Sequence, residues 1–240
     1  MKVLLVSFFN GEAYGMRALH VNLIKNGLHA DMLFFRLLDY YDKSKNESSK
    51  DDFIANLDSS SSQEIDLLVS HIKDNMYDAI GFSLVSQHFN LYKQIYEKIR
   101  NIEHLIVIVG GWQASLNPDK CINYTDFLCI GEGEEPLYEL VDKLEKKESI
   151  ENIKNIWVKR NGSVIKNPVR PLPKELSSFP VPLFEHKYCY VIEDNKIDNY
   201  DPYFNNSRYG TFIGRGCPYR CTYCSNSYMA NLKSRLKVFT

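Results

Sequence analysis

Apolar runs alternate with amphipathic segments through the first 147 residues of the chain. Residues 3–9 and 105–109 are continuous, largely β-branched apolar runs, and residues 79–84 and 127–130 are shorter versions of the same pattern. Runs of this kind are typical of strands covered on both faces of a sheet, so we expect parallel strands there. The intervening segments repeat apolar residues at i, i+3, i+4 and i+7, as in a helix that buries one stripe. These stripes are Ile65, Leu68, Val69, Ile72 and Met76; Tyr92, Ile95, Tyr96 and Ile99; and Leu137, Leu140, Val141 and Leu144.

The alternation of strands and helices predicts an α/β fold with a doubly wound parallel sheet. In such a fold the crossovers are right-handed, and a ligand lies beyond the carboxyl ends of the strands. Residues 43–64 interrupt the alternation with Lys, Ser and Asp. Because that composition can bury little surface, we expect a surface loop there.

The pattern changes after Glu148. Residues 153–166 predict a β-hairpin, because Asn161-Gly162 suits the positive φ angles of a tight turn between β-prone arms. Prolines between residues 168 and 182 then indicate an extended linker. The tyrosines of residues 183–209 either face a pocket or pack this linker against the preceding domain.

Composition narrows the class of protein. A chain of 240 residues with 44% hydrophobic content can form one large globular domain or two small ones. The net charge of −1 gives no broad basic field for nucleic acid and no polybasic arm for a membrane. The apolar N-terminus, residues 1–9, is too short to span a bilayer and lacks a signal-peptide cleavage site, so it predicts a buried strand.

Small and polar residues follow several of the predicted strands. Because the carboxyl ends of parallel strands meet at one edge of a sheet, these loops are expected to form a pocket there. Glycine lets a ligand approach the backbone closely, and serine hydroxyls add hydrogen bonds. The alternative is that these residues only make tight turns between strands and helices. The loops are residues 10–15, 83–87, 110–113 and 131–136.

Cysteine spacing gives the strongest chemical signal. Three of the six cysteines, Cys217, Cys221 and Cys224, lie in one loop with three and then two residues between them. Three thiolates can hold three irons of a [4Fe–4S] cluster and leave the fourth iron open to another ligand. The alternative is a structural zinc loop completed by Cys189 or His186, but zinc sites usually show a second C-x2-C pair, and the sequence has none.

The other cysteines predict no disulfide framework. With no export signal and half of the thiols in one loop, the natural setting is a reducing cytoplasm. Cys121 and Cys129 are interpreted as packed thiols.

The motif Cys217-x3-Cys221-x2-Cys224, with Tyr223 before its last cysteine, resembles the cluster motif of the radical S-adenosylmethionine (radical SAM) enzymes. The resemblance implies that SAM chelates the open iron and yields a 5′-deoxyadenosyl radical, with Tyr223 near the adenine. It also implies an external electron donor such as flavodoxin or ferredoxin. In that family the motif follows the first strand of a (β/α) barrel, here residues 211–214, and precedes a helix, here residues 227–237.

A second resemblance involves residues 78–83, Gly110-Gly111 and residues 131–137, which look like the cobalamin (B12)-binding domain that precedes the barrel in one radical SAM subfamily. It implies that the corrinoid tail lies near these residues. The implied contacts are Ser83, Ser86, Gly110, Gly111, Gly131, Glu132 and Gly133.

One position departs from that family. Many corrinoid domains hold cobalt with the histidine of a D-x-H-x-x-G loop, but the matching positions here are Asn10, Glu12 and Gly15. His20 and His88 are interpreted as ordinary surface or packed histidines. We therefore expect cobalamin without histidine ligation, and the same departure also permits a domain that has lost cobalamin.

These features predict three parts: a Rossmann-like, B12-binding-type domain over residues 1–148, a hairpin and Pro-rich linker over 149–209, and the first β/α unit of a truncated radical SAM barrel over 210–240. The last thirty or so residues are expected to pack poorly or to depend on a partner. The expected function is methyl transfer to, or oxidative cyclisation of, an unactivated carbon of a small-molecule substrate, with no catalytic residue assigned beyond the cluster ligands. The alternative is a non-catalytic module that binds a corrinoid or a partner.

Overall fold

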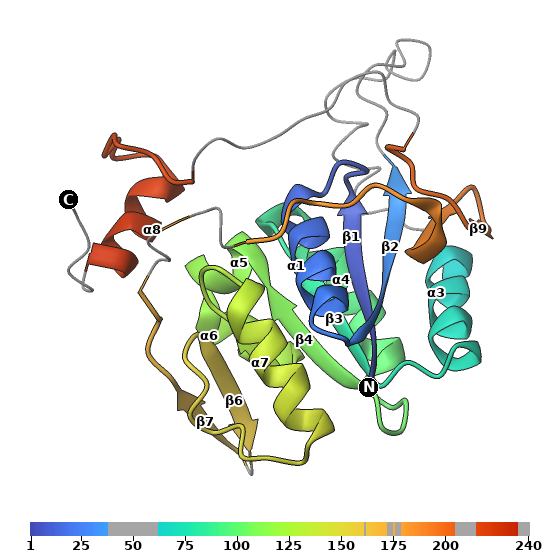
Figure 1. Ribbon diagram of the computed structural model, residues 1–240, viewed down its shortest axis with the longest axis horizontal. Helices are drawn as coiled ribbons and strands as arrows, with labels where there is room; N and C mark the ends of the chain where they lie inside the picture. Colours follow the sequence, from blue (N-terminus) through green and yellow to red (C-terminus); the bar gives the residue numbers. More distant parts are fainter. Residues whose placement is uncertain (38–61, 161, 172–174, 176–178, 205–214, 235–240) are drawn as a thin grey trace.

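The computed structural model describes residues 1–37, 62–160, 162–171, 175, 179–204 and 215–234. Within them, a nine-stranded sheet has the order β7-β6-β5-β4-β3-β1-β2-β8-β9 (Figure 1). The strands are β1 Lys2–Phe9, β2 His29–Leu37, β3 Ala79–Ser83, β4 Ile106–Gly110, β5 Phe127–Cys129, β6 Ile156–Arg160, β7 Ser163–Lys166, β8 Cys189–Glu193 and β9 Lys196–Asp198. The six strands β1 to β5 and β8 pair parallel to their neighbours among themselves, and β6, β7 and β9 extend the sheet antiparallel at its two ends.

Helices cover both faces of this sheet, which confirms the predicted doubly wound α/β fold. The buried residues of α1 and α7 belong to one hydrophobic cluster, and those of α3 and α4 belong to another. Strand β1 divides its side chains between the two, with Leu4 and Val6 in one cluster and Val3 and Leu5 in the other. The helices are α1 Tyr14–Lys25, α3 Ser62–Asp74, α4 Phe89–Ile99, α5 Gly111–Leu116, α6 Pro118–Cys121, α7 Glu134–Glu145 and α8 Ser225–Ser234.

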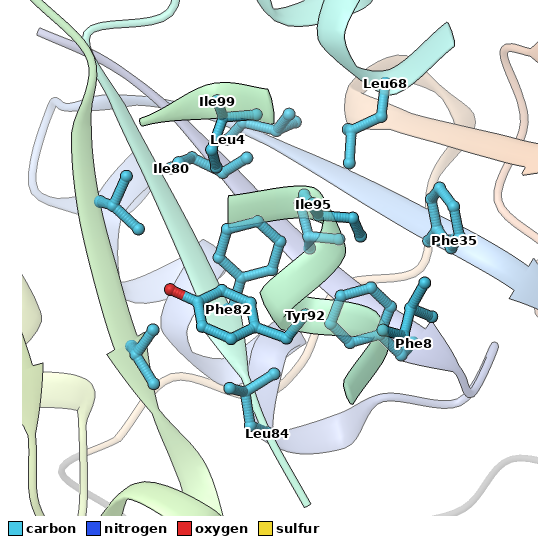
Figure 2. Packing of buried hydrophobic residues seen from close by; sticks show 14 of the residues in the cluster. Leu4, Phe8, Phe35, Leu68, Ile80, Phe82, Leu84, Tyr92, Ile95 and Ile99 are labelled. Atoms are coloured by element: carbon cyan, nitrogen blue, oxygen red, sulfur yellow. The ribbon is translucent and has the colours of Figure 1, made fainter. Parts of the chain in front are cut away.

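Aromatic side chains fill the layer between α4 and the sheet (Figure 2). The ring of Phe82 stacks on Phe8 at 5.8 Å and meets Tyr92 edge-on at 5.0 Å between centroids. The buried Tyr92 hydroxyl donates a hydrogen bond to the carbonyl of Tyr124, which satisfies its one polar group. Each such side chain contributes about 1.5–3 kcal/mol by leaving water, so this layer holds the central strands in place.

The predicted hairpin is confirmed as β6 and β7, which pair from Trp157↔Lys166 to Arg160↔Ser163. Gly162 has the expected positive φ of +77°, and Asn161 lies outside the described residues. The predicted loop over residues 43–64 lies mostly outside them too, and its last three residues form the first turn of α3 instead, because the helical stripe starts there.

Sequence reasoning did not find β8 and β9, which lie within the segment interpreted as linker. Strand β8 pairs parallel to β2 with the register Met32↔Cys189 to Phe35↔Ile192. Its residues Cys189, Val191 and Ile192 are buried. Of the predicted barrel unit, residues 211–214 lie outside the described residues, and the predicted helix is present as α8.

Within the part of the chain that the structure describes, no helix is both long and apolar enough to cross a membrane.

Candidate functional site

The loops after β3 and β4 meet at the carboxyl edge of the sheet, as predicted. The Leu84 amide donates to the Gly110 carbonyl at 3.0 Å, and the Gln113 amide donates to the Leu84 carbonyl at 2.9 Å. The Ser86 hydroxyl donates to Oε1 of Gln113 at 2.7 Å. The structure therefore brings Ser83, Ser86, Gly110 and Gly111 together, as the sequence indicated.

Gly111 owes its identity to the protein's own packing. It has a φ of +88°, and a Cβ at this position would lie 2.8 Å from the backbone N and O of Leu84. No side chain fits between two backbones at that distance. The glycine thus lets the loops after β3 and β4 pack against each other, and this requirement holds whether or not a ligand binds there.

The loop after β5 packs on the same edge. Gly131 has a φ of +82°, and its amide donates a hydrogen bond to the Ser115 hydroxyl oxygen at 3.0 Å. A Cβ at Gly133 would lie 3.2 Å from the side chain of Leu19 on α1. Gly133 also precedes α7, whose first turn carries Glu134 and Glu135, a favourable position for carboxylates. The three predicted residues Gly131, Glu132 and Gly133 therefore form a tight turn near the site.

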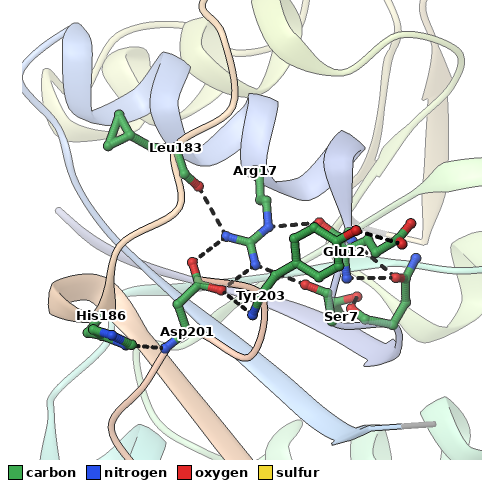
Figure 3. A network of polar contacts seen from close by, with 10 residues as sticks. Ser7, Glu12, Arg17, Leu183, His186, Asp201 and Tyr203 are labelled. Atoms are coloured by element: carbon green, nitrogen blue, oxygen red, sulfur yellow. Dashed lines mark hydrogen bonds and ion pairs between the residues drawn. The ribbon is translucent and has the colours of Figure 1, made fainter. Parts of the chain in front are cut away.

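The first loop is held by a buried arginine that sequence reasoning missed (Figure 3). The Arg17 side chain is fully buried and donates to both carboxylate oxygens of Asp201, at 2.7 and 2.6 Å. It also donates to the carbonyls of Gly11, Glu12 and Leu183. Its guanidinium lies over the rings of Phe34 and Phe184, at 5.0 and 4.3 Å. The segment around Asp201 therefore covers the loop in which a cobalt-ligating histidine would stand. A charged residue within the buried stripe of α1 was the available signal.

The loop in which an axial histidine would stand is closed by a polar turn. Asn10 Oδ1 accepts hydrogen bonds from the amides of Glu12 and Ala13, at 3.0 and 3.1 Å, which makes a side-chain turn just before α1. The Glu12 carboxylate accepts a hydrogen bond from the Tyr203 hydroxyl at 3.1 Å. Nothing lies within 4 Å of a Cβ placed on Gly15.

The two other histidines are packed side chains, as interpreted from the sequence. His20 Nε2 lies 2.9 Å from the Ala30 carbonyl, and burial lowers its pKa. His88 contacts the rings of Phe8 and Phe9 at 5.7 and 5.2 Å, and burial lowers its pKa to about 4. Both are therefore neutral imidazoles near pH 7.

The six cysteines divide into two environments. Cys121, Cys129 and Cys189 are buried, and burial raises their thiol pKa values to about 11, 12 and 12. This confirms Cys121 and Cys129 as packed thiols, and it places Cys189, the proposed fourth zinc ligand, inside the sheet on β8. Cys217, Cys221 and Cys224 lie half-buried or exposed on residues 215–224, which we call the cysteine loop.

The cysteine loop turns through Gly216, with a φ of +91°, and leads directly into α8. Within it the Cys224 amide donates to the Cys221 carbonyl at 3.1 Å, which the Ser227 hydroxyl also contacts at 2.7 Å. The Tyr223 side chain is 90% exposed.

The donor set fits an iron–sulfur cluster, since three accessible thiols lie within eight residues of one loop. Among the described residues, no group of three or more His, Cys, Asp or Glu side chains is gathered as metal ligands. Binding would therefore have to draw the three sulfurs together.

The cysteine loop lies beside the sheet domain. Arg215 forms ion pairs with Glu132 in the turn after β5 and with Glu134, the first residue of α7, and α8 contacts α5. Figure 1 shows α8 beyond the α5 end of the domain. Arg215, at the start of the cysteine loop, and α8, at its end, thus contact residues that follow β5 and β4.

Parts of this chain resemble known proteins. Residues 50–141 match the family model of the B12 binding domain. An uncharacterized methyltransferase of Pyrococcus horikoshii is 28% identical over 159 residues, which cover 63% of this chain and 29% of that protein. The chain therefore spans less than a third of the length of this curated relative.

Two solved structures are similar in fold. The cobalamin-dependent S-adenosylmethionine radical enzyme OxsB matches with a TM-score of 0.52 and 18% identity, over 75% of this chain and 24% of OxsB. The radical S-adenosylmethionine methyltransferase TsrM from Kitasatospora setae, with cobalamin and a [4Fe–4S] cluster, matches with a TM-score of 0.49 and 15% identity, over 78% of this chain and 33% of TsrM.

Proposed function

We propose that this chain, of which residues 50–141 match the family model of the B12 binding domain, is the corrinoid-binding and cluster-bearing part of a radical SAM enzyme. The observation that carries the proposal is the contrast among the cysteines. Three are buried with raised pKa values, whereas the three of the cysteine loop are accessible and lie beside the carboxyl edge of that domain. Accessible thiols at this short spacing suit metal ligation, and they make no contribution to core packing that would explain their presence.

In this proposal Cys217, Cys221 and Cys224 ligate a [4Fe–4S] cluster. When bound, the cluster supplies reductive cleavage of SAM and so a radical able to take hydrogen from an unactivated carbon. Tyr223, which is almost wholly exposed, offers an aromatic face beside the third cysteine on which an adenine can stack.

The carboxyl edge provides the corrinoid site in the same proposal. The Ser86 hydroxyl and the backbone around Gly110 and Gly111 lie at the position where doubly wound sheets bind ligands. The loop after β1 has no histidine, and His20 and His88 are held by packing, so the cobalt would be bound without histidine ligation. The Pyrococcus horikoshii relative is named as a methyltransferase, so we propose methyl transfer, for which a bound corrinoid would supply the chemistry, to a small-molecule acceptor.

Anaerobic reconstitution of the chain with iron and sulfide tests the cluster. We expect about four irons per chain and an EPR signal of the reduced protein that changes when SAM is added. The Cys221→Ala variant should lose both, whereas Cys121→Ala, a matched change of a buried thiol, should keep them. Wild-type protein without a cluster, or an unchanged cluster in Cys221→Ala, would contradict the proposal and leave the non-catalytic binding module as the better description.

Cobalamin binding is tested separately. On mixing hydroxocobalamin with the chain, we expect a shift in the visible spectrum that saturates at one corrinoid per chain. A bulky Ser86→Trp variant should weaken it, because the side chain lies between the two edge loops. A spectrum identical to that of the free corrinoid would refute this part of the proposal.

A further inference from the structure

We propose that Arg215 is a positioning residue that docks the cysteine loop onto the turn after β5, and this inference rests on the function proposed above. Nη1 of Arg215 lies 2.9 Å from Oε2 of Glu132 and 2.6 Å from Oε1 of Glu134. One guanidinium thus bridges two carboxylates that lie 83 and 81 positions earlier in the sequence.

Burial separates this contact from an ordinary surface ion pair. Exposed pairs contribute little because water screens both charges. The side chain of Glu134 is only 4% exposed, and that of Arg215 is 31% exposed. A carboxylate removed from water requires a partner, and losing that partner is costly. Arg215 therefore has a specific place to bind on the sheet domain.

The shape of the guanidinium adds a second contact. Its centre lies 5.0 Å from the ring of Phe179, in the segment that leads from the hairpin. A planar guanidinium can stack on a ring and bond carboxylates with its edge at the same time, whereas a lysine ammonium can do only the second. Arginine is thus suited to join three segments of the chain at this point.

The consequence concerns the two cofactor loops. Glu132 was predicted from resemblance as a corrinoid contact, but in the structure its carboxylate binds the cysteine loop. Arg215 stands two residues before Cys217, so fixing its guanidinium also limits where the first thiol can lie. The turn after β5 therefore sets the position of the proposed cluster relative to the proposed corrinoid.

Fluorescence of Trp112 can report the docking, because it lies on α5, the helix that α8 contacts. The chain has two tryptophans, so a Trp157→Phe background leaves Trp112 as the only tryptophan, which can be excited selectively over the tyrosines. In the full chain, Arg215→Gln should raise the acrylamide quenching constant of Trp112 about twofold, since α8 leaves α5. Glu134→Gln should give the same rise, and the double variant should add nothing further.

Two variants control the measurement. Arg220→Gln changes another arginine of the same loop, one that donates to the nearby carbonyls of Cys217 and Tyr219, and it should leave quenching unchanged. Arg215→Lys keeps the charge without the stacking face and should restore quenching in part. Quenching equal in Arg215→Gln, Arg220→Gln and the parent would overturn the inference, as would additive effects of Arg215→Gln and Glu134→Gln.

Salt provides a test that does not depend on whether a variant folds correctly. Raising NaCl from about 0.05 M to about 1 M shortens the screening length to about 3 Å, but salt screens a partly buried pair much less than an exposed one, so quenching in the parent should rise only slightly. A rise in the parent to the full Arg215→Gln value would show an ordinary exposed ion pair and refute the docking. Iron content separates this inference from the proposed function: equal iron in the parent and in Arg215→Gln supports positioning, whereas iron absent from both leaves the docking result standing and removes the cluster.

Discussion

Replacing Asp201 by asparagine should destabilise the protein more than any single surface change, because it leaves the Arg17 guanidinium buried without its counter-ion. Both side chains are fully buried, and Asp201 receives two short hydrogen bonds from Arg17. Breaking one partner of a buried pair typically costs about 3–5 kcal/mol. In a chain of this size each kcal/mol lowers the melting temperature by about 2–4 °C, so we expect a fall of about 6–20 °C.

Urea denaturation followed by far-UV circular dichroism measures this change directly. The midpoint should fall while the slope of the transition stays the same, since the surface exposed on unfolding is unaltered. Lys196→Ala, which breaks the exposed pair with Asp198, is the matched control and should cost less than about 1 kcal/mol. A loss below about 1 kcal/mol for Asp201→Asn would refute the reasoning that this pair ties the segment around Asp201 to the first loop.

Three further outcomes can be checked with similar methods. Gly111→Ala should cost about 2 kcal/mol or more in urea, since its φ is positive and Leu84 blocks the Cβ, whereas Gly15→Ala, in an open helical position, should be neutral or slightly stabilising. Burial depresses the pKa of His88 from 6.5 to about 4, so its contribution to stability is complete above pH 6.5 and is lost as the pH falls toward 4. The His88→Asn variant should therefore show a smaller fall in urea midpoint over that pH window. The control variant His104→Asn, which changes an exposed residue, should show the same fall as the parent. At pH 8 a chromogenic disulfide reagent should titrate three thiols quickly and the other three only after unfolding, because raised pKa values and burial protect the latter; six fast thiols would contradict the buried assignment.

Four parallel strands, β1, β3, β4 and β5, were predictable because each is a short apolar run that needs cover on both faces, whereas β2 was not among the predicted strands. Residues 3–9, 79–84, 105–109 and 127–130 all correspond to strands of the sheet. The glycines after β4 and β5 were also predictable, since only glycine suits their positive φ angles. Local chemistry dictates these features, and so the sequence displays them.

Long-range partners were not predictable in the same way. Strand β8 follows a proline-rich stretch and lies among tyrosines, asparagines and aspartates, so its alternation over five residues is weak. What makes it a strand is the free edge of β2, more than 150 residues earlier, as the register Met32↔Cys189 shows. The sequence shows Arg17 only as a charged residue within the buried stripe of α1, and it does not show that Asp201 is the partner, because the two residues are brought together only by the fold.

The position of β8 also bears on the order in which the chain folds during synthesis. Six consecutive residues of β2, Ala30–Phe35, are buried in the finished sheet, and among the described residues β8 is the strand that pairs with the edge of β2 opposite β1. Until the ribosome has released residues 189–198, β2 therefore presents unpaired backbone amides and carbonyls on a highly apolar strand, a surface on which two nascent chains can associate. The final short strand β9, with Lys196 and Asp198 exposed, then places charged side chains at the outer edge of the sheet. A polypeptide that ends at residue 148 would leave this edge of β2 unpaired permanently, so expression trials of the sheet domain should use a polypeptide that extends to residue 204.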